Sequence, residues 1–328
     1  MRFLLDDEQR EFARSLDALL TAADTPAVVR GWAEGHPGPG LTLWRRLADA
    51  GVFALAVPEV YGGVGPLPVE TAVALMELGR HGVPGPVVES VAAGVLLGGV
   101  GGPVAKEWLP RVASGTAVVS LVLEGYGPYA LDADVAEAVF SVAGDELRLT
   151  RGPGEPTPSM DPARRLFRPG AGGEVVATGP KVREAARAAG TWATFATAAQ
   201  ALGCGEALLR ATVAYVKQRT QFGVPVGSFQ AVKHRLADTL LGLEFARPLL
   251  YGAAVELAEG SPGAGAAVAA AKVAAGEAGY AAARTALQLH GAVGYTEELD
   301  LAWWLRRARP LRDAWGTPSA CRARVLQG

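Results

Sequence analysis

The stretch that decides the fold is "RTQFGVPVGSFQAVKHRLAD", Arg219–Asp238, in which an arginine precedes a Gln-Phe-Gly turn. A Gly-Ser-Phe-Gln step follows the turn, and an amphipathic helix pattern begins after it. Glycine and proline inside "FGVPVG" stop a helix that arrives from the N-terminal side. The stretch therefore predicts a break between two long helices, with an arginine at the break.

Long alanine-rich helices are predicted on both sides of this break. They run over 183–218, 229–259, 264–290 and 298–310. Glycine- or proline-rich runs separate them at "FGVPVG", "EGSPGAG" and "HGAVGYTEE". The many alanines in "GAAVAAAKVAAGEAGYAAARTALQ" let helices approach closely, so we expect a tight bundle or a subunit interface there and no catalytic role for them.

Earlier in the chain the pattern changes twice. Helical spacing occurs in the first third, for example at Phe12, Leu16 and Leu20. From about residue 117, short runs such as "AVVSLVLEG", "EAVFSVAG" and "DELRLT" predict a small β region, and the Pro/Gly-rich residues 151–173 predict a loop. We expect a mainly α protein with three domains. They are an N-terminal helical domain at 1–116, a reduced β domain at 117–180 and a C-terminal helical bundle at 181–328.

Composition excludes several classes of protein. The chain has 328 residues, of which 50% are hydrophobic and 20% charged, and its net charge is −2. This balance gives no reason to expect nucleic acid, and no apolar run predicts a membrane span or a signal peptide, so we expect a cytoplasmic protein. Cys204 and Cys321 lack partner spacing, so neither a disulfide framework nor a metal site is expected.

Three segments, taken together, resemble the acyl-CoA dehydrogenase family. They are "LADAGVFALAVPEVYGGVG", the stretch at 219–238, and "LQLHGAVGYTEELDLAWWLRRARPLRDAWGT", and they occur in the family's order. The resemblance implies a helical domain, a small β-barrel domain and a C-terminal four-helix bundle. It also implies FAD bound at a subunit interface, an acyl-CoA or other acyl thioester as substrate, and an oligomer. Family members remove the α-proton with a carboxylate while hydride passes to the flavin, which yields a 2,3-enoyl-CoA.

The resemblance also implies which residues contact the cofactor. Arg219 matches the arginine that meets the FAD pyrophosphate, for which a planar fork of donors is suited, although alone it reads as a surface arginine in a loop. Gln288 matches a glutamine that reaches a neighbouring subunit's FAD, so the two residues would serve different cofactors. His290 is expected to pack or cap. The remaining cofactor-binding candidates are Thr220, Gln221, Phe222, Phe229, Gln230, Gly291, Ala292 and Thr317.

Both of the family's positions for the catalytic base lack a carboxylate. Trp315 stands immediately before the C-terminal Gly-Thr, where many members have glutamate, and an indole cannot accept the proton. Ala193 occupies the neighbourhood of the second position. Asp313 and Asp238 are weaker substitutes, and Glu206 lies too far along its helix. We therefore expect no catalytic residue in this chain.

The β region also lacks family residues that shelter the flavin ring. Leu123 replaces a threonine, and no tryptophan occurs between Trp108 and Trp192. The leading hypothesis is a base-less subunit of a hetero-oligomeric FAD-dependent acyl-CoA dehydrogenase, paired with another chain of the family. One alternative is a self-sufficient flavoenzyme, homo-oligomeric, with a relocated base or an altered reaction on an acyl thioester. The other is a cofactor-free scaffold or binding subunit.

Overall fold

The computed structural model describes residues 4–170, 172–296 and 298–327. It divides into two compact units, one made of residues 1–26, 75–82 and 197–328, the other of residues 27–74 and 83–196. We call them the bundle unit and the sheet unit. None of the described helices is long and apolar enough to cross a membrane.

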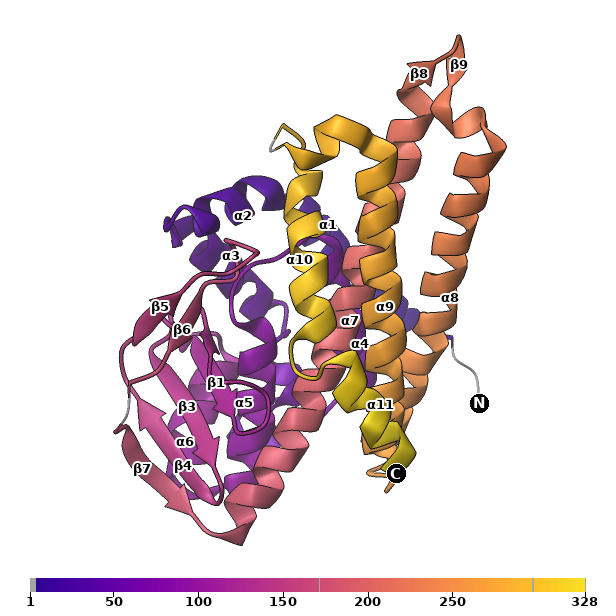
Figure 1. The fold of residues 1–328 in the computed structure, drawn as a ribbon. Coiled ribbons are helices and arrows are strands. Elements are labelled where there is room, and N and C mark those ends of the chain that lie inside the picture. The colour runs from indigo at the N-terminus through magenta and orange to yellow at the C-terminus, as the bar shows by residue number, and fades with distance from the viewer. Residues whose placement is uncertain (1–3, 171, 297, 328) are drawn as a thin grey trace. The chain divides into compact units, whose positions relative to one another are not determined.

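The bundle unit is built from long helices that lie side by side (Figure 1). The helices are α1 (Asp7–Thr21), the end of α4 (Pro68–Arg80), the C-terminal half of α7 (Pro180–Gln218), α8 (Gln230–Ala258), α9 (Ala264–His290), η4 (Gly291–Tyr295), α10 (Leu301–Asp313) and α11 (Pro318–Gln327). Between α7 and α8, the chain forms a hairpin of β8 (Thr220–Gln221) and β9 (Val224–Pro225), followed by the short helix η3 (Val226–Ser228).

Small side chains at the centre of the bundle let α7 and α9 approach closely. A β-carbon added to Gly205 would lie 2.9 Å from the Cα of Gly279, and one added to Gly279 would lie 2.6 Å from the carbonyl oxygen of Ala201. Alanines and leucines of α7, α9 and α10 fill the remaining core around Cys204 and Leu208. The alanine-rich sequence therefore forms a tight bundle, because only small residues fit between helices at this separation.

The sheet unit combines short helices with small sheets. Its helices are α2 (Thr25–Ala33), α3 (Gly38–Asp49), η1 (Ala54–Ala56), η2 (Glu59–Tyr61), the start of α4, α5 (Val87–Val100), α6 (Gly102–Ala113) and the start of α7. Large aromatic side chains form its core. Trp44 stacks on Phe53 with ring centroids 4.0 Å apart, and Trp108 meets Phe140 edge to face at 5.3 Å.

The strands of this unit form a four-stranded and a three-stranded sheet. The first has the order β1 (Val119–Leu123), β3 (Ala138–Ala143), β4 (Glu146–Thr150), β7 (Glu174–Thr178), with β1 and β3 parallel and the other pairs antiparallel. The second has the order β2 (Ala130–Leu131), β6 (Leu166–Arg168), β5 (Glu155–Thr157) and is antiparallel. The hydroxyl of Ser120 donates to the carbonyl of Leu131 and joins the two sheets.

The fold class predicted from the sequence is confirmed, a mainly helical chain with a small sheet region. One local prediction was wrong. Strands β5 and β6 lie inside the expected loop at 151–173, where Pro156 is accommodated because β5 is an edge strand. The three-domain division at 116 and 180 stays a prediction.

Candidate functional site

The hairpin after α7 is a two-residue turn that presents its tip to solvent. Thr220 pairs with Pro225 and Gln221 with Val224, which leaves Phe222 and Gly223 as the turn. Their φ angles are 53° and 80°, and positive φ at both central positions is the mark of a type I′ turn, whose twist matches a hairpin. Phe222 is 92% exposed. The local sequence thus projects an apolar ring and its polar neighbours away from the bundle.

Arg219 stands at the base of this hairpin and is anchored by its backbone only. Its N–H donates to Tyr215 O at 2.9 Å, and its carbonyl accepts from Val226 N at 2.7 Å. The exposed side chain forms no hydrogen bond or ion pair with any residue that the structure describes. A guanidinium held this way has all five donors available for an anion.

The start of α8 lies directly beside the hairpin. Phe229 precedes the helix in an extended conformation, and its ring meets that of Phe222 edge to face with centroids 6.3 Å apart. Gln230 is the first helical residue and is exposed. The structure therefore brings the predicted residues 219–222 together with 229–230 on one exposed edge.

The end of α9 reaches the same end of the bundle. The ring of His290 stacks on that of Tyr215 at 4.1 Å, and its Nδ1 lies 2.8 Å from the carbonyl of Ala286. Burial lowers the pKa of His290, which favours the neutral ring that packs here. Gln288 is exposed and accepts a hydrogen bond from Arg235 of α8.

Gly291 and Ala292 follow at once in η4, and both are exposed. Gly291 has a φ of 64°, which glycine adopts without strain, and its open surroundings leave its backbone accessible. The expectation that Arg219 and Gln288 serve separate cofactors stays a prediction. The two lie at one end of the bundle because Tyr215, one turn before Arg219, contacts His290.

This end of the bundle carries an excess of positive charge. The exposed basic residues around the hairpin and the start of α8 are Lys217, Arg219, Lys233 and Arg235, and the exposed acid among them is Asp238. Such a cluster attracts an anion and fits the negatively charged diphosphate of a dinucleotide. FAD is the dinucleotide that the sequence resemblance implies, and these donors suit its diphosphate end.

The turn between α10 and α11 lies at the opposite end of α9. Lys272, 1% exposed, donates to the carbonyls of Leu311 at 2.9 Å, Arg312 at 2.8 Å and Gly316 at 3.3 Å. Along α9 the separation from Lys272 to His290 is about 27 Å at ~1.5 Å per residue. Thr317, which is exposed and accepts from Ala320 N, is therefore not brought together with Arg219 within one chain.

Trp315 occupies this turn as a mostly buried residue. It is 8% exposed and has a φ of 54°, an unusual value for a bulky side chain. The nearest carboxylate in sequence, Asp313, is held by Arg309 Nε at 2.8 Å and Arg312 at 3.2 Å. Asp238 is exposed on α8, and Glu206 is paired with Arg80 and Arg247. Arginines therefore engage Asp313 and Glu206, whereas Asp238 is an exposed carboxylate on α8 rather than in the turn that holds Trp315.

The two remaining sequence positions lie in the sheet unit. Ala193 is fully buried in α7, and Leu123 ends β1 with 3% exposure. Neither side chain offers a donor or an acceptor, so the ring-binding hydroxyl expected of the family is absent at Leu123. The chain has groups suited to the diphosphate end of FAD, but at Leu123 and Ala193 it lacks the hydroxyl and the carboxylate that the family places near the flavin ring.

Sequence reasoning missed Arg235 and Lys272. Arg235 belongs to the quoted stretch at 219–238, and its place one to two turns after Gln230 could have marked it as facing the same end. Lys272 gave no usable signal. It is one lysine inside an alanine-rich helix, and only packing shows that it caps α10.

Comparison with known proteins identifies both helical parts. Residues 184–327 match the family model described as acyl-CoA dehydrogenase, C-terminal domain, and residues 6–116 match the corresponding N-terminal domain. The chain is 36% identical over 305 residues to acyl-CoA dehydrogenase IpdE2 of Mycobacterium tuberculosis, covering 92% of this chain and 91% of that protein.

Solved structures share the fold along the whole chain. The ChsE4–ChsE5 complex from Mycobacterium tuberculosis aligns with a TM-score of 0.82 and 26% identity, covering 100% of this chain and 98% of that one. PigA with FAD and proline aligns with a TM-score of 0.86 and 20% identity, covering 100% and 98%, a likeness of fold alone.

Proposed function

Because the chain belongs to the acyl-CoA dehydrogenase family, we propose that it is the subunit without a catalytic base in a hetero-oligomeric, FAD-dependent acyl-CoA dehydrogenase. The partner is a second family chain that retains glutamate before its C-terminal Gly-Thr. The substrate class is an acyl-CoA, and the product is the 2,3-enoyl-CoA. The proposal places this protein in the cytoplasm.

The observation that carries the proposal is Trp315. It stands at the family's base position, and it is buried in a turn that Lys272 braces through Gly316. Removal of an α-proton beside a thioester requires a basic group within hydrogen-bond reach, and an indole N–H only donates. A chain built this way depends on a partner for the proton transfer.

A relocated base within this chain has less support. Asp313 is the closest candidate in sequence, but two guanidiniums, those of Arg309 and Arg312, engage its oxygens. Both of its oxygens are therefore occupied by arginine donors rather than open to a substrate proton. Ala193 contributes no acid at the second family position.

A second chain is also needed to complete a cofactor site. The basic end of the bundle, with Arg219 and Gln288, and the α10–α11 turn, with Thr317, lie at opposite ends of α9. We propose that Arg219, Thr220, Gln221, Phe222, Phe229, Gln230, Gln288, Gly291 and Ala292 contact one FAD, and that Thr317 contacts another. Each FAD would then lie at a subunit interface. The ChsE4–ChsE5 complex, a structure of two differently named chains, agrees with such an assembly.

Within that site this chain's residues bind and orient the cofactor. Arg219 and Arg235 offer guanidinium donors to the diphosphate, and the edge-to-face pair Phe222 and Phe229 offers an apolar surface beside it. FAD, when bound, supplies the hydride acceptor for the α,β-dehydrogenation. The proton leaves to the partner's carboxylate.

The test compares the chain alone with the chain co-purified with a full-length family member that has Glu-Gly-Thr intact. Acyl-CoA oxidation is followed with an artificial electron acceptor, and flavin is quantified by absorbance. We expect activity only in the complex. Full dehydrogenation of an acyl-CoA by the lone chain would refute the proposal, and a complex without flavin would favour the scaffold alternative.

Replacing Arg219 tests the diphosphate contact in the same complex. We expect Arg219→Ala to weaken FAD binding roughly ten- to hundredfold, since a hydrogen bond to a charged group contributes about 1.5–3 kcal/mol. Arg187→Ala, which removes an exposed arginine elsewhere on α7, is the matched control and should leave the Kd unchanged. Equal FAD affinities of the two variants would contradict the assignment.

A further inference from the structure

We propose that Asp17, Glu77 and His81 form a binding site for a divalent transition-metal ion of the zinc class, which links α1 to the end of α4. We call these three residues the α1–α4 ligand set. Among the residues that the structure describes, they are the group whose His and carboxylate ligand atoms converge, all within 4.8 Å of one another. The site is separate from the proposed flavin contacts and does not rest on the proposed function.

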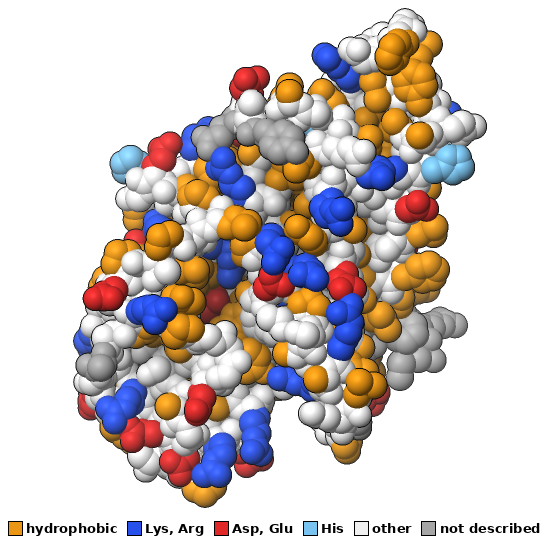
Figure 2. All heavy atoms as spheres, in the orientation of Figure 1, with side chains coloured by type: hydrophobic (Ala, Val, Ile, Leu, Met, Phe, Trp, Pro, Cys, Tyr) orange, Lys and Arg blue, Asp and Glu red, His pale blue; other side chains and the backbone are white. Residues whose placement is uncertain are grey.

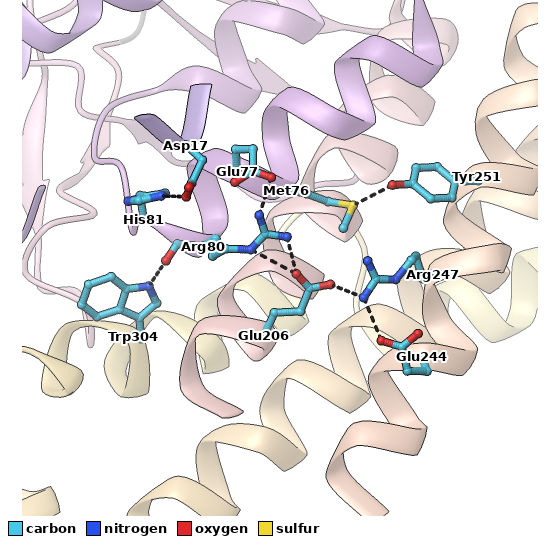
Figure 3. Close-up of polar contacts among 10 residues, drawn as sticks. All are labelled: Asp17, Met76, Glu77, Arg80, His81, Glu206, Glu244, Arg247, Tyr251 and Trp304. Atoms are coloured by element: carbon cyan, nitrogen blue, oxygen red, sulfur yellow. Dashed lines mark hydrogen bonds and ion pairs between the residues drawn. The ribbon is translucent and has the colours of Figure 1, made fainter. Parts of the chain in front are cut away.

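The three side chains point toward one another from two segments (Figure 3). Asp17 lies on α1, Glu77 lies on α4, and His81 follows that helix directly. His81 Nε2 is 2.7 Å from Asp17 Oδ1. Zinc bonds of about 2.0–2.2 Å set tetrahedral ligand atoms roughly 3.3–3.6 Å apart, so the set needs only small side-chain adjustments to hold an ion.

Glu77 supplies an independent indication of a missing ligand. Its side chain is 7% exposed and lies between Asp17 and Arg80 in Figure 3. One oxygen, Oε1, accepts from Arg80, whereas the buried Oε2 has no hydrogen-bond partner among the described residues. A buried carboxylate oxygen without a donor is costly, and a cation would satisfy it.

The surrounding charges leave room for a cation. The charge of Arg80 is shared between Glu77 and Glu206, because its Nε and one terminal nitrogen bind Glu206 at 3.2 and 2.5 Å. Arg247 in turn binds Glu206 and Glu244 at 3.0 and 2.9 Å. This network holds four carboxylates and two guanidiniums, so it carries no excess of positive charge that would repel a cation. The carboxylates are Asp17, Glu77, Glu206 and Glu244, and the guanidiniums are Arg80 and Arg247.

The ligand types and their surroundings indicate the class of metal. One imidazole nitrogen with two carboxylates suits zinc and neighbouring first-row ions better than calcium or magnesium, which take oxygen ligands alone. His81 also lines a cavity of about 440 Å³ within the bundle unit, together with Leu20, Arg210 and Trp304. Three protein ligands would leave the fourth position of a tetrahedral ion open to another ligand such as water.

The experiment titrates zinc into the full-length chain after treatment with EDTA, by calorimetry, and measures bound zinc after dialysis. We expect about one equivalent per chain. Asp17→Asn and His81→Gln should each weaken zinc binding at least ~10-fold. Each change removes a direct metal ligand, and even the loss of a residue that only hydrogen-bonds to a ligand costs about 10-fold in affinity. Asp17 is half-exposed, so Asp17→Asn tests the site even if a change at His81 impairs folding.

Matched controls separate this site from other zinc-binding groups. Asp7→Asn changes an exposed acid on the same helix, and His234→Gln changes an exposed histidine on α8. Both should bind zinc as the wild type does. Wild-type stoichiometry below about a tenth of an equivalent, or unchanged affinity in Asp17→Asn and His81→Gln, would overturn the proposal and leave Asp17 and His81 as an ion pair only.

Discussion

Asp132 is a fully buried carboxylate in the sheet unit. One oxygen accepts from Trp32 Nε1 at 3.0 Å and from the backbone N–H of Arg165 at 3.2 Å. The other oxygen is buried and has no hydrogen-bond partner among the residues described. Burial raises the pKa of Asp132 from 3.8 to about 7, against the opposing effects of Trp32 and Arg165. The site therefore favours the protonated acid.

Stability should fall with rising pH through this group. Between pH 4 and pH 7 the folded state retains a proton that the unfolded state has released, so raising the pH favours unfolding, by about 4 kcal/mol at the upper limit. Asp132→Asn should remove this loss and become more stable relative to wild type as the pH rises. Urea unfolding at pH 5 and pH 8 measures the free energy of unfolding of both proteins. Asp134→Asn, which changes a carboxylate nearer the surface, is the control. A stability difference independent of pH would contradict this account.

Lys272 shows the reverse case, a buried cation with enough partners. Its ammonium donates to two carbonyls at the end of α10 and to that of Gly316 in the following turn, and cations interact favourably with this end of the helix dipole. Lys272→Met would keep the apolar stem but leave those carbonyls without this donor. We expect a loss of roughly 1–3 kcal/mol in the free energy of unfolding.

The same change should also disturb the turn that holds Trp315. Guanidinium unfolding measures the stability loss, and tryptophan emission reports the turn. Lys181→Met, an exposed lysine at the start of α7, is the comparison and should change neither. Equal stability of the two variants would show that Lys272 does not brace α10.

At the scale of the secondary-structure element, helix α9 contains two glycines with different surroundings. Gly279 faces α7, where an added β-carbon would meet the backbone of Ala201 at 2.6 Å, whereas Gly265 meets nothing within 4 Å. One glycine is required for close approach, and the other is only a weak helix former. The distinction is invisible in the sequence, since both stand in alanine-rich surroundings.

Substituting these two glycines should therefore have opposite effects. Gly279→Ala forces the helices apart and should destabilise the chain by about 1–3 kcal/mol. Gly265→Ala should stabilise it by roughly 0.5–1 kcal/mol, because alanine restricts the unfolded chain and fits the helix. The midpoint of thermal unfolding, measured for both variants, tests whether the two stability changes have opposite signs. Changes of the same sign would mean that the α7–α9 contact is looser than the structure has it.

The elements themselves were largely predictable. The expected helices at 229–259 and 264–290 differ from α8 and α9 by a residue at most at each end. Helical periodicity and the Gly/Pro breaks are local signals, so they survive without knowledge of the neighbours. Strands β5 and β6, of three residues each, depend on pairing across a loop, which no local pattern reveals.

At the scale of the molecule, one face of α8 is apolar and exposed. Leu241, Phe245 and Leu249 repeat every four residues with exposures of 53%, 71% and 47%, and Leu240 lies beside them. Figure 2 shows hydrophobic side chains along this helix and at the hairpin above it. Because the face continues toward the basic end of the bundle, we expect the second family chain to cover it.

A charge on this face should prevent assembly. Phe245→Glu should weaken association at least ~10-fold, because an aromatic residue at the centre of an interface contributes strongly and a buried carboxylate without a partner is costly. Size-exclusion chromatography with light scattering measures the mass. Leu326→Glu, which changes an 87% exposed residue of α11, should leave it unchanged. An intact oligomer of Phe245→Glu would place the interface elsewhere.

The sequence by itself determined the family, the order of helical, β and helical regions, and the absence of a carboxylate at Trp315 and Ala193, because these are matters of local pattern and residue identity. Only the tertiary structure decided that Arg219 and Gln288 lie at one end of the bundle, that Lys272 caps α10, and that Asp17, Glu77 and His81 converge. The physical reason is that such contacts join side chains far apart in the chain. Their distances are set by how closely the helices pack, which no short-range pattern encodes.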